Sequence, residues 1–181
     1  KEYFAKRNDP EGLELLLGRV LAGSPPQAPG LGTLRLARAE LLAGKLRRYD
    51  EAEREVRQVL AETPGSVPAL LALGELHLSR DNPALAQVEY HSVLERDPFR
   101  ADAYRGLRRV FTAKGEQERA RLASQVLVAL GAATVPEQQL AQGLAATLTA
   151  ANAPLGVDAY GRLLAPRDDF PAGRVLLGAL S

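Results

Sequence analysis

The amino-acid sequence predicts an all-α solenoid of stacked helix-turn-helix repeats, closed by a helical cap at its C-terminal end. A short motif, an alanine followed four residues later by a second core position, recurs every 34 residues. Its three copies are Ala52-x3-Val56, Ala86-x3-Tyr90 and Ala120-x3-Ser124. Prolines follow the first two copies, and apolar residues recur at the three- and four-residue spacing of amphipathic helices. A fixed period of this length is typical of stacked repeats, none of which can bury its apolar face alone.

The composition is that of a folded, nearly neutral chain. With 46% hydrophobic residues, the 181 residues can bury a substantial core. A formal net charge of +1 gives no electrostatic case for nucleic acid or a membrane surface. The absence of cysteine excludes disulfides and leaves the compartment open, with the cytoplasm favoured over the periplasm. No run of 18 apolar residues exists, so we expect no direct membrane insertion. Because the sequence contains no methionine, we expect it to be part of a longer protein.

The segment 67–100 shows the repeat most clearly. Its first apolar stripe, Leu70-x2-Leu73-Gly74-x2-His77, ends at the turn signal Asp81-Asn82-Pro83. A second stripe runs from Ala86 to Leu94 and ends before the next proline, which stops a helix at the preceding residue. The segment is therefore predicted to form two amphipathic helices, with Tyr90 filling the space between successive pairs.

These residues resemble the tetratricopeptide repeat family, whose 34-residue units are helix-turn-helix pairs. The resemblance implies a right-handed α-solenoid. In one register it covers three repeats, at residues 33–66, 67–100 and 101–134. The first departs from the family pattern at Ala39-Glu40, and the third places Arg108 where a small residue is usual. The stretch from Asp97 to Leu140 bears a weaker resemblance to segments of large repeat proteins of myxobacterial type.

Residues 1–32 are predicted to extend the array backwards as a partial repeat and a loop. Asn8-Asp9-Pro10 has the spacing expected at the start of the second helix of such a repeat. The Pro/Gly-rich stretch at residues 24–32 then reads as a lengthened connection or a hinge.

Two alternatives stay open for residues 135–181, a degenerate repeat or a helical cap over the apolar end of the solenoid, and we favour the cap. Thr134 is the predicted N-cap of a helix that Pro136 opens and that runs to about Ala151. Two shorter helices are expected at residues 154–164 and 168–180.

The sequence carries no motif of an enzyme. It contains neither G-x-S-x-G nor H-E-x-x-H, and Gly30-Leu31-Gly32 follows no strand and lacks the third glycine of a phosphate loop. The acidic pair Asp168-Asp169 fits the first turn of a helix better than it fits a glycosidase pair. Of the two histidines, we expect His77 to pack in the core and His91 to lie on the surface. We therefore predict a non-catalytic protein without a cofactor or a metal.

In the tetratricopeptide repeat family, the first helix of each repeat lines a concave groove that holds a partner. Carried onto this sequence, the resemblance implies a partner-binding set of Arg38, Leu41, Lys45, Leu71, Glu75, Leu78, Arg105 and Arg109. Arg105 and Arg109 lie four apart, where like charges repel unless an acidic group is near. They indicate a basic spot for a carboxylate or an acidic peptide. The alternative is a solvated face whose charges are satisfied by Glu75 or Asp102.

One familiar activity of the family is not expected. Members that hold the acidic C-terminal tails of chaperones use lysine, asparagine and arginine at set positions of the first helix. The corresponding residues here are Ala37, Leu41, Ala72, Asp102 and Gly106, and none supplies the cation or the amide. Leucines with scattered arginines instead predict an amphipathic peptide or helix as partner.

The predicted function is a protein–protein interaction module that binds a partner peptide or helix in the concave groove. Nucleic-acid binding is not expected, because aromatic stacking residues are scarce. The alternative is a structural spacer within a longer repeat array of a bacterial envelope, secretion or motility assembly.

Overall fold

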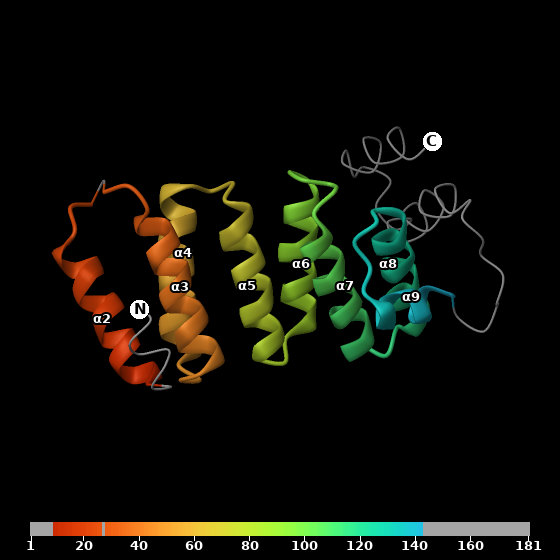
Figure 1. Cartoon of the computed structure of the whole chain (residues 1–181), viewed down its shortest axis with the longest axis horizontal. Coiled ribbons are helices and arrows are strands. Elements are labelled where there is room, and N and C mark those ends of the chain that lie inside the picture. The colour runs from red at the N-terminus through yellow and green to blue at the C-terminus, as the bar shows by residue number, and fades with distance from the viewer. Residues whose placement is uncertain (1–8, 27, 143–181) are drawn as a thin grey trace. The chain divides into compact units, whose positions relative to one another are not determined.

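The computed structural model of the chain describes residues 9–26 and 28–142 (Figure 1). Every regular element in these ranges is an α-helix, which confirms the predicted all-α repeat fold for the described residues. The eight helices are α2 (Pro10–Gly23), α3 (Leu31–Gly44), α4 (Tyr49–Glu62), α5 (Val67–Ser79), α6 (Pro83–Leu94), α7 (Ala101–Ala113), α8 (Gln117–Ala129) and α9 (Val135–Gln142). The helices predicted at residues 154–164 and 168–180 lie outside the described residues.

The chain forms two compact units, Lys1–Asp81 and Asn82–Ser181. The described helices of the first unit are α2 to α5, and those of the second are α6 to α9. Because the boundary falls inside the predicted repeat 67–100, its two helices belong to different units. The pairing expected for them, like the predicted repeat boundaries, therefore stays a prediction.

In the first unit, α3 packs against α2, α4 and α5, and α4 also packs against α5 (Figure 1). The core between α3, α4 and α5 consists of small and branched apolar side chains at helical spacing. Its buried members are Ala39, Leu42, Ala52, Val56, Val59, Ala69, Leu73 and Leu76. The first copy of the repeated motif thus supplies core residues of α4, and its alanine is only 1% exposed.

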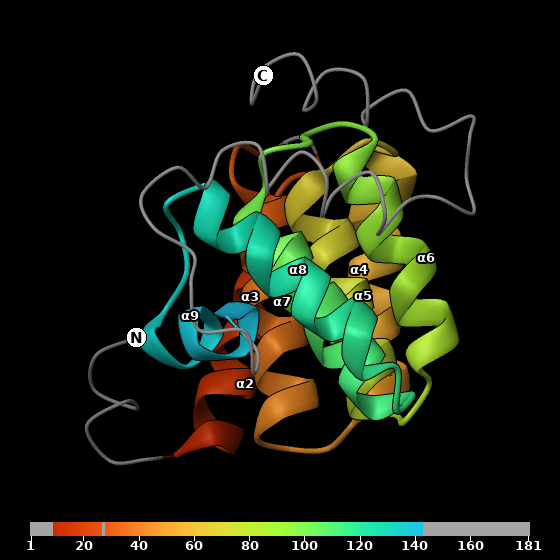
Figure 2. The same ribbon diagram turned by 90° about the vertical axis from the view of Figure 1, so that its right-hand side faces the viewer.

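In the second unit, α7 packs against α6 and α8, and α8 packs against α9 (Figure 2). Tyr90 on α6 is fully buried. A Cβ atom at Gly106 on α7 would lie 2.2 Å from Tyr90 Cζ, so only glycine lets α7 approach the ring this closely. Tyr104 is also fully buried, and its hydroxyl donates to the carbonyl oxygen of Pro98 at 2.8 Å. The prediction that Tyr90 fills an interhelical space is confirmed, and the space lies between α6 and α7.

Polar N-caps followed by proline begin three of the helices. Asp9 Oδ1 accepts a hydrogen bond from Gly12 N at 2.8 Å at the start of α2. Ser66 and Asn82 accept equivalent bonds at the starts of α5 and α6. Each cap satisfies a backbone N–H that the helix leaves without a partner, and proline needs none there.

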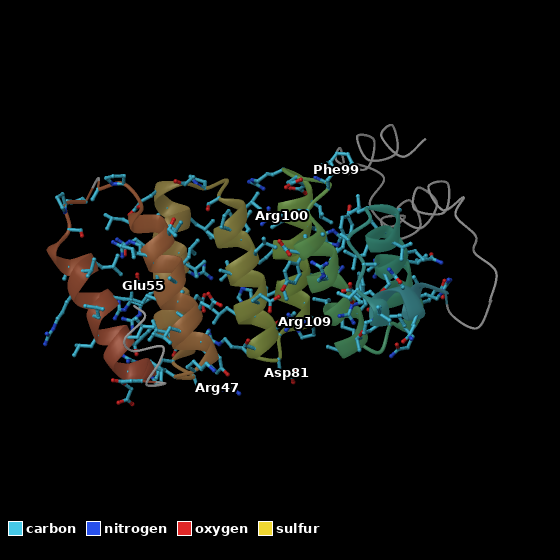
Figure 3. All side chains as sticks on the ribbon, in the orientation of Figure 1. Arg47, Glu55, Asp81, Phe99, Arg100 and Arg109 are labelled. Atoms are coloured by element: carbon cyan, nitrogen blue, oxygen red, sulfur yellow. The ribbon has the colours of Figure 1, made fainter. Side chains whose placement is uncertain are left out.

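Three of the tight turns between helices contain a residue in the left-handed conformation at the same repeating position. These residues are Arg47 (φ 56°), Asp81 (φ 56°) and Gly115 (φ 75°), which follow the 34-residue period of the sequence. Figure 3 shows Arg47 and Asp81 at the same end of the first unit. A left-handed backbone costs energy for an L-residue but not for glycine. The left-handed conformation thus recurs every 34 residues, although the residue that adopts it is arginine, aspartate or glycine.

Candidate partner-binding surfaces

The predicted partner-binding residues of the first unit lie on α3 and α5, which pack against each other. Leu41 lies in the last turn of α3 and Lys45 is the C-cap residue of this helix, while Leu71, Glu75 and Leu78 form a stripe on α5. These positions are distinct from the stripes that supply the core of the unit. Lys45 and Glu75 are exposed, whereas the three leucines are partly exposed. Such a combination of apolar and charged side chains suits an amphipathic segment.

Arg38, the remaining predicted residue of α3, is held by two carboxylates of its own unit. Its Nη2 atom lies 2.5 Å from Glu14 Oε1 on α2, and its Nη1 atom lies 2.5 Å from Glu55 Oε1 on α4. Gly18 faces the guanidinium, and a Cβ there would be 3.5 Å from Nη2. Burial lowers the pKa of Arg38, but the hydrogen bonds and charges of the two carboxylates outweigh burial and raise it above its ordinary value. Arg38 therefore joins three helices, and its role in binding stays a prediction.

Two further arginines extend this cluster. Arg35 pairs with Glu55 at 3.0 Å, and Arg48 reaches Glu14 at 3.4 Å. The Glu14 side chain is only 11% exposed, so these charges are partly shielded from water. Sequence reasoning missed the cluster because its members are separated by 17 to 34 residues along the chain. No local spacing identifies pairs that only tertiary packing brings together.

In the second unit, α7 carries a polar stripe opposite its buried stripe. The buried residues are Ala103, Tyr104, Gly106, Leu107, Val110 and Phe111. The polar stripe contains Asp102, Arg105, Arg109 and Thr112, and Figure 3 marks Arg109. Arg105 Nη1 lies 3.4 Å from Asp102 Oδ1 on the same helix. The two predicted arginines thus belong to the outward side of α7, Arg109 exposed and Arg105 partly buried.

A carboxylate from α9 also lies against α7. Glu137 Oε1 is 3.3 Å from Arg105 Nε and 3.8 Å from Arg108 Nε. Arg105 Nη2 donates a hydrogen bond to the carbonyl oxygen of Ala132 at 2.5 Å, in the connection that precedes α9. The carboxylate that Arg105 meets therefore belongs to this chain, and the second arginine that faces it is Arg108. The departure from the family pattern at Arg108 was a signal for this contact.

The other carboxylate oxygen of Glu137 holds the start of α9. Glu137 Oε2 accepts hydrogen bonds from Thr134 N at 2.7 Å and from Thr134 Oγ1 at 2.9 Å. The predicted helix start at Thr134 is confirmed, and the pair forms the reciprocal side of a capping box. Burial raises the pKa of Glu137, but the bonds from Thr134 and the charges of Arg105 and Arg108 outweigh it and lower the pKa. Glu137 is therefore ionised at neutral pH.

The two histidines are both buried. His77 is 6% exposed, as expected, and burial lowers its pKa. The expectation that His91 lies on the surface is wrong, because this side chain is 4% exposed and its Nε2 atom lies 3.4 Å from Gln87 Nε2. The physical reason is that the buried sector of α6, which includes Tyr90, Val93 and Leu94, is wide enough to take in His91 at its edge.

The described part of the chain has neither a cluster of metal ligands nor a helix suited to span a membrane. Residues 9–26 and 28–142 contain no group of three or more His, Cys, Asp or Glu side chains placed to hold a metal ion. None of the helices in these same ranges has the length and apolar character needed to cross a membrane.

The tetratricopeptide repeat family model matches residues 41–111, which run from the last turn of α3 into α7. No curated protein matches the chain. Together with the packing of successive helices, the match shows that this segment belongs to the tetratricopeptide repeat family. Repeats of this family generally mediate protein–protein interaction and are typically non-catalytic. The matched segment contains Leu41, Lys45, Leu71, Glu75, Leu78, Arg105 and Arg109 from the predicted binding set.

Proposed function

We propose that this chain is a non-catalytic interaction module that holds a peptide or a helix of a partner protein against its repeat helices. The observation that carries the proposal is the surface of α3 and α5. There Leu41, Leu71 and Leu78 remain partly exposed, with the opposite charges of Lys45 at the C-cap of α3 and of Glu75 on α5. A surface of this kind suits an amphipathic segment, which would bury its own apolar side against the leucines.

The leucines and the charges would have different roles. Removing apolar surface from water contributes about 25 cal/mol per Å², so the leucines would supply most of the affinity. Charged groups at the edge of such a contact select partners and set the register more than they add affinity. In this proposal Lys45 and Glu75 act in the first unit, and Arg105 and Arg109 act on α7 in the second. Arg38 would contact a partner only after breaking its ion pairs with Glu14 and Glu55.

The experiment is a crosslinking capture from the native cell with the wild-type chain and two matched variants. Leu71→Glu places a charge on the proposed surface, and Leu15→Glu makes the same change on α2, where Leu15 is 54% exposed. We expect Leu71→Glu to lose the partner that the wild type captures, while Leu15→Glu keeps it. Circular dichroism checks that both variants remain helical. Equal capture by both variants would contradict the proposed surface.

The ion pairs of the first unit favour a second candidate function. Arg38 and Glu55 join α3 to α4, and Glu14 joins α2 to the same cluster, as expected of a stiff segment. In this alternative the chain is a structural spacer in a longer repeat array of a bacterial envelope, secretion or motility assembly. Replacing residues 31–134 in the parent protein by an unrelated repeat array of equal length separates the two candidates. A spacer tolerates the exchange, whereas a specific binding module does not.

A further inference from the structure

Arg105 and Arg108 lie one turn apart on α7 and share one carboxylate from α9. We propose that these two arginines form a binding subsite for a carboxylate of an acidic partner peptide, which Glu137 occupies while the partner is absent. The inference rests on the proposed function, because it assigns a ligand class to one part of the partner-binding surface. The two positions differ from those of the chaperone-tail clamp, which correspond to Asp102 and Gly106 in this repeat.

Glu137 fills the subsite incompletely. Only its Oε1 atom faces the arginines, at 3.3 Å from Arg105 Nε and 3.8 Å from Arg108 Nε, because Oε2 is bound by Thr134. The Nε atom of Arg108 is buried and has no hydrogen-bond acceptor. Arginine binds a carboxylate best through two parallel N–H···O bonds. A carboxylate with both oxygens available would therefore satisfy Arg108 better than Glu137 does.

The subsite can be reached from solvent, and its surroundings are basic. The side chains of Arg105 and Arg108 are 35% and 28% exposed, whereas Glu137 is 4% exposed. Asp102, on the same helix, pairs with both Arg100 and Arg105. In these ion pairs Arg100, Arg105 and Arg108 share the two carboxylates of Asp102 and Glu137, and a basic cluster of this kind attracts an anion.

The competing carboxylate need not dismantle α9. Glutamine serves at the third helical position of a capping box as glutamate does, so the bonds to Thr134 do not depend on the charge. The link between Glu137 and the arginines is thus separable from the start of the helix. While Glu137 occupies the subsite, a partner carboxylate can bind only to the fraction of molecules in which the subsite is open. The apparent affinity for the partner is reduced by that fraction. Removing the charge of Glu137 should therefore strengthen binding.

The test uses the 181-residue chain, a fluorescein-labelled hexaglutamate peptide and its hexaglutamine counterpart at low salt. Glu137→Gln removes the internal charge, and Glu118→Gln removes the same charge on α8, where Glu118 pairs with Arg121. We expect Glu137→Gln to bind hexaglutamate at least about fivefold more tightly than wild type. Glu118→Gln should match wild type, and hexaglutamine should bind to none of the proteins.

Adding Arg105→Gln and Arg108→Gln to the Glu137→Gln variant should weaken hexaglutamate binding by at least about tenfold. Hydrogen exchange over residues 135–142 checks that α9 is still formed. If Glu137→Gln disturbs α9, then Glu137→Asp, which keeps the charge but shortens the side chain, provides the comparison and should also bind more tightly than wild type.

Equal affinity of wild type and both Glu137 variants would overturn the inference, as would tight binding that survives loss of the two arginines. Absence of hexaglutamate binding to any of these proteins also overturns it. None of these results bears on the capture experiment with Leu71→Glu, so failure of the subsite and failure of the proposed function can be told apart.

Discussion

The close approach of α6 and α7 makes Gly106→Ala the sharpest test of the packing. The added methyl carbon would stand 2.2 Å from Tyr90 Cζ, whereas ordinary contacts begin at 3.4 Å, so ring and backbone must separate by roughly 1.2 Å. Tyr90 is fully buried and cannot swing into solvent. Overpacking that needs backbone movement costs about 3 kcal/mol, and we expect a loss of that size in the free energy of unfolding.

The assay is urea denaturation of the whole chain followed by circular dichroism. Gly44→Ala is the matched control, because a Cβ at Gly44 meets nothing within 4 Å. This variant should be unchanged or more stable by up to about 1 kcal/mol, the difference in helix propensity. In a Tyr90→Leu background, which removes the obstructing ring, Gly106→Ala should cost less than about 1 kcal/mol. A Gly106→Ala variant within about 0.5 kcal/mol of wild type would refute the packing of α6 against α7.

Three further predictions follow from the turns, the ion pairs and the buried histidine. Gly115→Ala should destabilise by about 1 to 2 kcal/mol in urea denaturation, because φ is +75° there, while Arg47→Gly at the equivalent turn should not destabilise; equal losses would contradict this. Arg38→Ala should cost about 2 kcal/mol, because Glu14 and Glu55 each lose their shortest ion pair and keep only Arg48 at 3.4 Å and Arg35 at 3.0 Å. Arg96→Ala, at an exposed position just past the end of α6, should change little in the same assay. Burial lowers the pKa of His77 below its ordinary 6.5, so the unfolded chain binds a proton that the folded chain does not. Stability should therefore fall as the pH drops below about 6.5, and His77→Gln should make that fall shallower; an unchanged slope would argue against a buried neutral His77.

The core positions of the repeated helices could be predicted because they follow two sequence periods, the spacing of an amphipathic helix and the 34-residue repeat. Ala52 and Val56 combine helical spacing with the 34-residue repeat, and both are 1% exposed. The burial of His91 could not be predicted, because the prediction assumed one narrow buried stripe on each helix. The buried sector of α6 is wider than such a stripe and includes His91. The left-handed turn at Arg47 was also hidden, because arginine gives no local signal for a positive φ.

The candidate site was predictable only where exposure follows from helical spacing. Lys45 and Glu75 are exposed, as their positions on the helix surface imply. The partners of Arg38 and Arg105 could not be predicted, because Glu55 and Glu137 lie on other helices that folding brings near. Spacing along α7 paired Arg105 with Arg109, whereas the carboxylate from α9 faces Arg105 and Arg108.

Photocrosslinking in the native cell tests the proposed partner-binding surface most directly. A photoreactive amino acid is placed at Lys45, the C-cap of α3, or, for comparison, at Leu15 on α2, both of which are exposed. We expect one protein to crosslink from position 45 and not from position 15, and we expect this crosslink to disappear in the Leu71→Glu variant. The same products from both positions, or a crosslink from position 45 that survives Leu71→Glu, would contradict it.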